Sequence, residues 1–389
     1  MTEYKLSDLF DLQMGKTPSR NNPEYWDSND NKWISIGDLS KCGKFISETK
    51  EYLSDLAVTE SGISLIPADT VVMSFKLSIG KTAITAEPMY SNEAIMSFRD
   101  KHIVELLPDY IYYMFSEKDW DAGTNKAVMG KTLNKATLSN IKVRVHEIEE
   151  QRKIVEVLDK VTAVIDGHQR ELQSLDDLIK ARFVEMFGDP EHNSKAWPVQ
   201  PLDSLCSVGS SKRIYQNEQS ADGVPFWRIS DLASKIDTGV ADSGLFIPEE
   251  KYQELKQAGL VPVAGDILVT SRGTLGRCYI IQEEDKFYFQ DGMISWLSNY
   301  TESITPLYLK YLFTMTGFRK QIDGMQAGST VAYLSIAMLK KLRIMVPTKE
   351  AQIEFKNFVA QADKSKSSVQ KALDEAQTLF DSLMQEYFG

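Results

Sequence analysis

Residues 33–39 read WISIGDL, and residues 226–232 repeat this pattern as FWRISDL. Further pairs of similar segments follow in the same order, displaced by about 193 to 201 residues as small loop insertions would cause. They are residues 65–81 with 261–277, 108–115 with 306–313, and 130–132 with 328–330. Chance similarities would not keep one order along the chain, so the sequence predicts two duplicated domains.

Each half is typical of a mixed α/β domain followed by one long helix. Short apolar runs at 70–74 and 266–270 predict strands, and the Gly- and Asn-rich pieces between such runs predict loops. The segments after Glu147 and Thr348 have no proline until Pro190 and the chain end, respectively, which favours helices. We therefore expect an α+β protein with two duplicated mixed α/β domains and two long helices. The expected bounds are 1–145 for the first domain, 146–190 for the central helix, 191–347 for the second domain and 348–389 for the C-terminal helix.

Both helical segments carry an apolar seam that recurs every three or four residues, a pattern typical of a coiled coil. About 40 residues at about 1.5 Å each would form a rod of roughly 60 Å. A rod with one apolar stripe needs a partner helix, and the other copy is the obvious candidate. Gly167 and the run 364–368 weaken the helical pattern near the middle of each helix. These positions could be a kink or a solvated face, or a bend that a partner subunit uses. The seam residues are Ile154, Leu158, Val161, Ile165, Leu172, Leu175 and Ile179 in the first helix, and Val359, Val369, Leu373, Phe380 and Leu383 in the second.

Length and composition indicate a multidomain globular protein of the cytoplasm. The 389 residues exceed one ordinary core, and 42% hydrophobic with 25% charged residues is a usual globular balance. No apolar stretch approaches the roughly 20 residues that cross a bilayer, and the start lacks a secretion signal. Three cysteines far apart in the sequence predict reduced thiols.

The net charge of −11 argues at first against a nucleic-acid partner, but its distribution matters more than its sum. Residues 1–145 hold 17 basic and 20 acidic side chains, and 191–347 hold 16 and 17. Residues 146–190 hold 6 and 11, and 348–389 hold 5 and 7. Most of the acidic excess therefore lies in the two helical segments, and the near-neutral domains can still present basic faces.

No catalytic motif is complete. Residues 22–25 (NPEY) lack the second proline of the box with which adenine methyltransferases hold their target base, and no Gly-x-Gly occurs to hold a dinucleotide or S-adenosylmethionine. A phosphate-binding loop ending at Thr132 would need glycine where Asn125 stands. The histidines and cysteines show no metal-ligand spacing. We therefore expect no catalytic residue, no cofactor and no metal in this chain.

Three pairs of expected loops at matching places in the two halves are rich in side chains that contact phosphates and base edges. They are residues 14–22 with 209–217, 74–81 with 270–277, and 130–135 with 328–333. Their tips differ between the halves, as expected if each half reads a different sequence. Arg213, Arg272 and Arg277 suit guanine, and Asn21, Asn134 or Gln216 suit adenine. The candidate DNA-binding residues are Lys16, Thr17, Arg20, Asn21, Lys76, Lys81, Lys131, Thr132 and Lys135 in the first half, and Ser211, Lys212, Arg213, Arg272, Arg277, Ser329, Thr330 and Tyr333 in the second.

Four segments carry a resemblance to a known family. They are KLSDLF at 5–10 with GKTP at 15–18, WISIGDL at 33–39, Glu150-Gln151 followed by Ile154-Val155, and Phe183 through Phe187-Gly188-Asp189-Pro190. With these, essentially the whole chain resembles the specificity subunit of Type I restriction–modification enzymes. The second half departs from the pattern in having Ala351-Gln352 where the first has Glu-Gln.

The resemblance implies a non-catalytic, sequence-specific DNA-binding subunit. Each of two target-recognition domains would read one half of a split DNA site, and an antiparallel coiled coil of the two helices would separate them. The helices would bind two methyltransferase subunits, which carry S-adenosylmethionine and flip out adenine. ATP-dependent restriction subunits would join this core.

Two other functions stay open at this stage. One is a coiled-coil scaffold whose duplicated domains bind protein, and the other is a DNA methyltransferase or nuclease with cryptic motifs.

Overall fold

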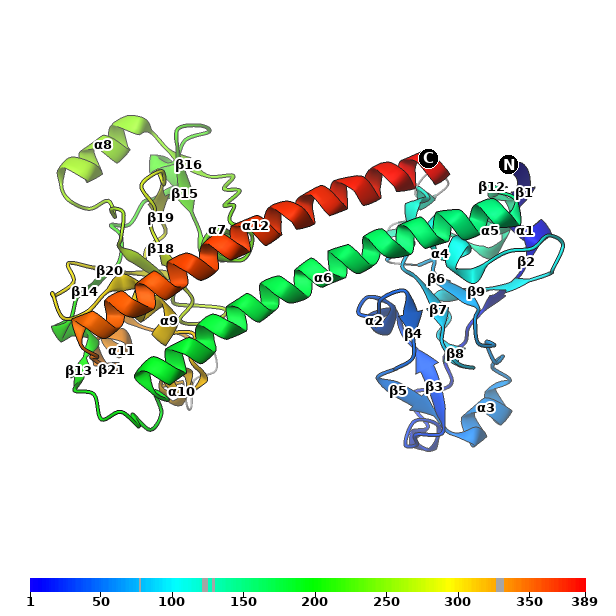
Figure 1. Ribbon diagram of the computed structural model, residues 1–389, viewed down its shortest axis with the longest axis horizontal. Coiled ribbons are helices and arrows are strands. Elements are labelled where there is room, and N and C mark those ends of the chain that lie inside the picture. Colours follow the sequence, from blue (N-terminus) through cyan, green and yellow to red (C-terminus); the bar gives the residue numbers. More distant parts are fainter. Residues whose placement is uncertain (77, 121–124, 128–129, 327–331) are drawn as a thin grey trace. The chain divides into compact units, whose positions relative to one another are not determined.

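The computed structural model spans Met1–Gly389 and describes residues 1–76, 78–120, 125–127, 130–326 and 332–389. The chain divides into two compact units. Figure 1 draws the ribbon in colours that follow the sequence. Unit 1 consists of residues 1–169 with 371–389, and unit 2 of residues 170–370. Each unit thus contains one mixed domain and a part of both long helices. Among the described residues, no helix combines the length and the apolar character needed to cross a bilayer.

The elements of the two units follow the same order along the chain. Outside the long helices, unit 1 contains β1 (Thr2–Lys5), α1 (Leu6–Leu9), β2 (Phe10–Met14), η1 (Pro23–Tyr25), β3 (Asn31–Ile34), α2 (Ile36–Leu39), β4 (Phe45–Ile46), β5 (Glu51–Leu53), α3 (Asp55–Ser61), β6 (Val71–Ser74), β7 (Thr82–Thr85), β8 (Tyr90–Ser91), β9 (Ile95–Asp100), α4 (Pro108–Glu117), β10 (Asn125–Ala127), β11 (Gly130–Thr132), α5 (Lys135–Asn140) and β12 (Lys142–Val145). Unit 2 contains β13 (Val199–Pro201), η3 (Leu202–Ser204), β14 (Ser207–Gly209), η4 (Gln216–Glu218), β15 (Val224–Trp227), α7 (Ile229–Thr238), β16 (Phe246–Ile247), α8 (Glu249–Gln257), β17 (Ile267–Thr270), β18 (Cys278–Ile280), β19 (Tyr288–Phe289), β20 (Ile294–Ser298), α9 (Pro306–Leu312), α10 (Thr316–Gly324), α11 (Ile336–Lys341) and β21 (Arg343–Met345).

The strand pairing of unit 2 repeats that of unit 1, except that unit 1 also pairs β4 with β7 and β10 with β11 among the described residues. The largest sheet has the order β2-β9-β6-β7-β4 in unit 1 and β14-β20-β17-β18 in unit 2. A three-stranded sheet, β5-β3-β8 or β16-β15-β19, joins one antiparallel and one parallel neighbour to its middle strand. The first and last strands of each domain, β1 with β12 and β13 with β21, pair antiparallel. The duplication predicted from the sequence is therefore confirmed.

The central strands are the apolar runs that predicted strands. All residues of β6 and of β17 are buried. A strand that is covered on both faces needs a continuous apolar run instead of an alternating one, which explains the sequence of both segments. Each strand contributes to the main core of its unit, Val71 and Met73 in unit 1 and Ile267 and Val269 in unit 2.

The long helices are α6 (Ile148–Phe187) and α12 (Lys349–Phe388), and both continue through the weak middles noted in the sequence. In unit 1, Leu158 of α6 lies in one core with Met384 of α12. In unit 2, Phe183 of α6 packs edge-on against Phe355 of α12, with ring centroids 5.5 Å apart. The start of each helix thus lies with the end of the other, so the pair runs antiparallel.

The predicted seam residues all lie on the covered sides of the two helices. Charged residues within the seam region form ion pairs between the helices in unit 2. Lys366 lies 2.6 Å from Asp176, and Arg182 lies 2.7 Å from Glu354. The seam residues that are buried are Ile154, Leu158, Ile165, Ile179, Val359 and Val369, and those that are half-buried are Val161, Leu172, Leu175, Leu373, Phe380 and Leu383.

A buried glutamine fastens the start of each long helix to the domain before it. The side chain of Gln151 accepts a hydrogen bond from the backbone N–H of Leu107 at 3.1 Å and donates to the carbonyl of His146 at 2.9 Å. Gln352 accepts from the N–H of Thr305 at 2.9 Å and donates to the carbonyl of Pro347 at 3.0 Å. Of the pairs Glu150-Gln151 and Ala351-Gln352, the glutamine therefore makes the same two backbone contacts in both halves.

Replacing Gln352 with leucine is expected to destabilise unit 2 by about 2–4 kcal/mol, because it leaves buried backbone groups without partners. Denaturant unfolding followed by circular dichroism measures the loss. Gln377→Leu is the matched control, since the side chain of Gln377 donates to Asp381 on the exposed helix surface, a contact with a value of about 0.5 kcal/mol or less. Equal losses for the two variants would contradict the assigned role.

Candidate nucleic-acid interface

The three predicted loops of unit 1 meet around the connection between β8 and β9. We call residues 14–22 the first loop, 74–81 the second loop and 130–135 the third loop of this unit. Lys16 donates its backbone N–H to the carbonyl of Ser91 at 2.8 Å, and Phe75 donates to the carbonyl of Ala94 at 2.9 Å. Leu133 donates to the carbonyl of Phe75 at 3.1 Å. Backbone bonds therefore bring the three loops together at one edge of the main sheet.

Unit 2 repeats the arrangement around the connection between β19 and β20. Its first loop is 209–217, its second loop 270–277 and its third loop 328–333, of which 332–333 are described. The hydroxyl of Ser211 donates to the carbonyl of Phe289 at 2.7 Å. The N–H of Ser271 donates to Met293 at 2.9 Å, and the N–H of Leu334 donates to Ser271 at 3.0 Å. The same three segments thus meet in both units.

The second loop is a tight hairpin closed by a hydroxyl. Ser74 accepts the N–H of Lys81 at 3.1 Å, and Thr270 accepts the N–H of Arg277 at 3.0 Å. The residue before each cation is a glycine, at 80 and at 276, with φ of 88° and 72°. Glycine adopts these left-handed angles at little cost, so the hairpin holds a cation at the same place in each unit.

One carboxylate in each unit anchors the first loop, and the sequence reading did not single out either of them. Glu93 accepts a hydrogen bond from the hydroxyl of Thr17. Burial opposes ionisation of Glu93, but the bonds from Thr17 and from the backbone, with the charges of Lys76 and Arg20, hold its pKa below the usual range. A repeat search over 92–97 and 290–295 would have found this pair of positions, because NEAIMS there corresponds to QDGMIS.

The counterpart in unit 2 is Asp291, whose Oδ2 lies 2.9 Å from Nε of Arg213. A carboxylate facing DNA would repel phosphates, and both of these are bound to a residue of the first loop instead. We therefore assign Glu93 and Asp291 to shaping the loops.

Three of the predicted DNA-binding arginines are held by carboxylates. Arg20 forms two bonds to Glu51, at 2.5 and 3.0 Å, and its guanidinium lies 3.6 Å from the ring centroid of Trp26. Arg277 forms two bonds to Asp237, one of 3.0 Å. Hydrogen bonds from Arg277 lower the pKa of Asp237. Together with Arg213, these arginines already have much of their donor capacity used within the protein.

Other predicted cations form no salt bridge with a carboxylate in the part of the chain that the structure describes. The amino group of Lys16 donates to the carbonyl of Ser61, and that of Lys76 lies 5.2 Å from the ring centroid of Phe75. Arg272 lies over the ring of Tyr333. The remaining members of this set are exposed, and they are Lys81, Lys135 and Lys212.

The other candidates divide between exposed positions and positions outside the described part. Asn21 is exposed, and Asn134 caps α5 by accepting the N–H of Thr137 at 2.8 Å. Gln216 starts η4. Residues Ser329 and Thr330 lie outside the described residues, as do the side chains of Lys131 and Thr132. The segment 130–132 was expected as a loop and forms β11 instead, because its backbone pairs with β10.

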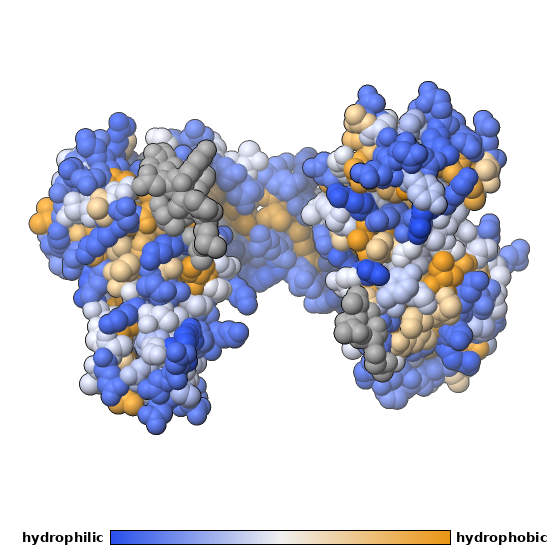
Figure 2. All heavy atoms as spheres, turned by 180° about the vertical axis from the view of Figure 1, so that it is seen from behind, coloured by the Kyte–Doolittle hydropathy of each residue, from blue (hydrophilic) through white to orange (hydrophobic). Residues whose placement is uncertain are grey.

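The visible surface of both units is mostly hydrophilic. On the face shown in Figure 2, hydrophobic residues form small separate groups on the mixed domains and gather along the visible side of the long helices. Wide apolar patches mark protein-binding surfaces more often than nucleic-acid-binding ones. On this face, the domains therefore fit a polar ligand better than the helices do.

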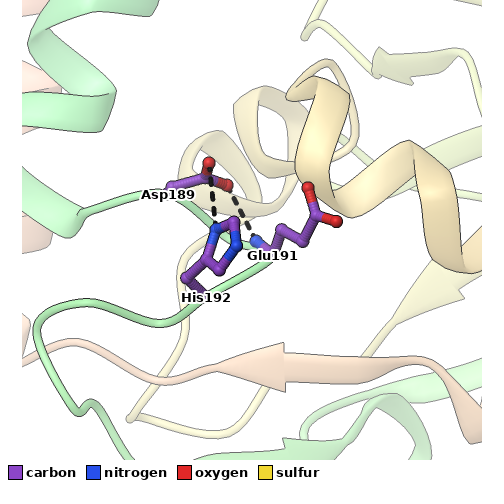
Figure 3. Close-up of side chains that lie close together, drawn as sticks. All are labelled: Asp189, Glu191 and His192. Carbon is purple, nitrogen blue, oxygen red and sulfur yellow. Dashed lines mark hydrogen bonds and ion pairs between the residues drawn. The ribbon is translucent and has the colours of Figure 1, made fainter.

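One group of side chains in the described part has the composition of a metal site. The possible ligand atoms of Asp189, Glu191 and His192 lie within 4.8 Å of one another just after α6, as Figure 3 shows. Asp189 accepts the backbone N–H of Glu191 at 2.8 Å and lies 3.5 Å from Nδ1 of His192. Glu191 pairs with Lys320 at 2.5 Å. These contacts describe a hydrogen-bonded turn that ends the helix.

Comparison with known proteins identifies the family. The model of the Type I restriction modification DNA specificity domain matches residues 1–176 and 194–376, which is most of the chain and both halves of the repeat. The chain belongs to the Type I specificity subunits. A specificity subunit provides the DNA sequence specificity of a restriction–modification enzyme and is not catalytic. This confirms the resemblance seen in the sequence, and it excludes a methyltransferase or nuclease with cryptic motifs.

Individual relatives of this specificity subunit cover nearly its whole length. The Type I restriction enzyme MjaIX specificity subunit of Methanocaldococcus jannaschii is 23% identical over 402 residues, 98% of this chain and 90% of the relative. The solved S subunit from M. genitalium is 14% identical with a TM-score of 0.54, covering 100% of this chain and 96% of that one. A chain from a solved structure on the assembly and conformational transition of the type I R-M system is 13% identical with a TM-score of 0.58. The match covers 100% of this chain and 97% of that one. The two structures support the fold.

Proposed function

We propose that the three loops of each unit form a DNA-binding surface and that each surface binds one half of a split site. Unit 1 would read one half through the domain at 1–145, and unit 2 the other through the domain at 191–347. The observation that carries this proposal is the repeated meeting of matching loops at the same sheet edge in both units, with cations in all three loops of unit 1 and in the first and second loops of unit 2. A duplicated surface is what a two-part site requires.

The charge distribution supports contact with phosphates at these loops. Lys16, Lys81, Lys135 and Lys212 are exposed and have no carboxylate partner among the described residues. Lysine side chains of this kind bind phosphates and release counterions from DNA, which supplies affinity without sequence selection. Base edges would then be read by side chains with fixed geometry.

The helix segments 146–190 and 348–389 would set the spacing of the half-sites and hold the partner enzymes. Their acidic excess, seen in 11 acidic against 6 basic residues of the first segment, disfavours contact with phosphate. Large aliphatic side chains of the helices are exposed, among them Val164, Leu178 and Leu379, each about half accessible. Exposed apolar side chains on a paired helix suit a protein partner. We propose two methyltransferase subunits, which would bring S-adenosylmethionine, together with ATP-dependent restriction subunits.

Neutralising single lysines tests the loops. In a complex with the methyltransferase, Lys81→Gln and Lys212→Gln are each expected to make the negative slope of log K against log salt shallower by about 0.9. This is the value for one lost phosphate contact. Fluorescence anisotropy with a duplex carrying the methylated site measures the slope. Lys195→Gln, an exposed lysine outside the loops, should leave it unchanged. A complex without salt-sensitive affinity for the duplex would favour the scaffold whose duplicated domains bind protein.

Exchanging residues 191–347 for the corresponding domain of another specificity subunit tests the independence of the two readers. One half of the methylated sequence is expected to change and the other to stay, because each unit has its own loops and core. Sequencing of methylated adenines in cells carrying the chimera provides the readout. A change in both halves would contradict the proposal.

A further inference from the structure

The three arginines of the unit 2 loops differ in what binds their guanidinium groups. Arg213 contacts Asp291, and Arg277 forms two bonds to Asp237. Arg272, at the tip of the second loop, is exposed and meets no carboxylate in the described part of the chain. Its guanidinium carbon lies 5.5 Å from the ring centroid of Tyr333. Of the three, Arg272 alone therefore combines an aromatic neighbour with donors that bind no carboxylate among the described residues.

The backbone holds Arg272 and Tyr333 next to each other. Ser271 and Leu334, their chain neighbours, are joined by a 3.0 Å backbone hydrogen bond and are almost fully buried. The hydroxyl of Ser271 also bonds to that of Ser295 at 2.8 Å inside the sheet. The two side chains thus start from adjacent, well-packed points of the backbone. The cation–π contact with the ring then reduces the freedom of the guanidinium before any ligand binds.

The hairpin gives this arginine a defined position in the second loop. Thr270 donates its hydroxyl hydrogen to the carbonyl of Thr274 at 2.6 Å and accepts the N–H of Arg277, which closes the turn around the tip. The N–H of Tyr333 donates to the side-chain oxygen of Gln326 at 2.8 Å, which fixes the other partner. Both sides of the stacked pair are therefore restrained by hydrogen bonds.

We propose that Arg272 is a specificity-determining residue that reads one guanine in the half-site bound by unit 2, donating hydrogen bonds to its O6 and N7 atoms. This inference rests on the proposed role of the loops in DNA binding. A planar fork with its donors free matches the two acceptors of a guanine edge, and it is the commonest specific contact to that base. Tyr333 acts as a positioning residue that orients the fork.

The corresponding position in unit 1 carries a different cation. Lys76 occupies the same place in the second loop, since 74–81 and 270–277 are matching segments. A lysine is a flexible point charge without the planar fork of arginine. The guanine contact is therefore assigned to the unit 2 half-site alone.

The experiment removes the N7 acceptor of the guanine and the side chain of Arg272, first separately and then in combination. The half-site is first identified by sequencing methylated adenines, with the 191–347 exchange showing which half belongs to unit 2. Each guanine of that half-site is then replaced in turn by 7-deazaguanine, which lacks the N7 acceptor, in duplexes that bind the assembled complex. One replacement is expected to weaken wild-type binding by about fivefold or more. For Arg272→Ala, the same replacement should have no further effect.

Arg272→Ala itself should bind the cognate duplex about tenfold to a hundredfold more weakly and lose its preference at that one base pair. Tyr333→Leu should relax the same base pair to a smaller extent, because the arginine remains but is no longer oriented. Arg343→Ala, which removes an exposed arginine of β21, should leave every base preference intact. Thermal unfolding of each variant checks that unit 2 is folded.

Three results would overturn the inference. The first is a unit 2 half-site without a G·C pair, because Arg272 would then have no guanine to contact. Uniform weakening on all duplexes, with a salt slope reduced by about 0.9, would assign Arg272 to a phosphate and leave the proposed role of the loops intact. No change in either property, while Lys212→Gln still lowers the salt slope, would place Arg272 away from DNA. If Lys81→Gln and Lys212→Gln also have no effect, the proposed function fails as well.

Discussion

Replacing Phe355 with alanine is expected to destabilise unit 2 by about 3–5 kcal/mol, the usual cost of deleting a buried aromatic ring. Phe355 is fully buried near the start of α12. Its ring packs against Phe183 and Phe187 of α6 and against Tyr311, with centroids 5.5, 5.4 and 5.3 Å apart. One side chain therefore connects both long helices to α9.

The loss should be visible as a lower unfolding midpoint in denaturant, with the unit 2 half of the DNA site lost before the unit 1 half. Ile353→Ala is the matched control, because Ile353 is a large aliphatic residue of the same helix turn but 47% exposed. Surface changes of this type usually cost about 0.5 kcal/mol or less. A Phe355→Ala variant as stable as Ile353→Ala would show that the aromatic cluster does not hold the helices to unit 2.

Inserting one helical turn into both long helices is expected to lengthen the gap between the half-sites and abolish methylation at the original sites. Four residues add about 6 Å to a helix, which equals one to two base pairs at about 3.4 Å each. Four residues also turn the helix by about 40° beyond a full rotation, whereas the DNA groove turns by roughly 60° over the same length. The displaced domain would therefore have to adjust by about 20° to face the groove again.

The insertions belong after Gln169 in α6 and after Gln370 in α12, where each helix passes from one unit to the other. Good helix formers such as alanine, glutamate and lysine preserve the helices there. Sequencing of methylated adenines gives the new gap. An insertion in α6 alone is the control and should abolish methylation, because the two helices can no longer pair in register. An unchanged gap in the double insertion would contradict the spacing role of the helices.

The helices and strands could be predicted because their signals are local. A repeat of apolar residues every three or four positions is visible in the sequence of α6 and α12, and short apolar runs at 71–73 and 267–269 mark β6 and β17. The duplication added a second, independent copy of each signal. The order of the strands within the sheets was not predicted, because it depends on pairings between distant segments.

The candidate site was predicted by its loops but not by the state of each cation. Nothing near Arg277 in the sequence shows that Asp237, forty residues earlier, takes up its donors. The same holds for Arg20 and Glu51. Equal arginines in the sequence thus became unequal in the fold, because only tertiary structure decides which carboxylate reaches which guanidinium. The anchoring carboxylates at 93 and 291 lie in matching segments, 92–97 and 290–295, so the duplication could have indicated their positions but not their bonds.

The division of the long helices between the units has a consequence for synthesis on the ribosome. Unit 1 begins with the first residue, yet its core includes Met384, with Phe380 and Leu383 packed against it, from the segment 371–389 that is translated after all of unit 2. The apolar face around Leu158 must therefore stay uncovered while more than half of the chain is made. A nascent chain stalled before this segment would present that face to chaperones or proteases, whereas the released chain can close both cores.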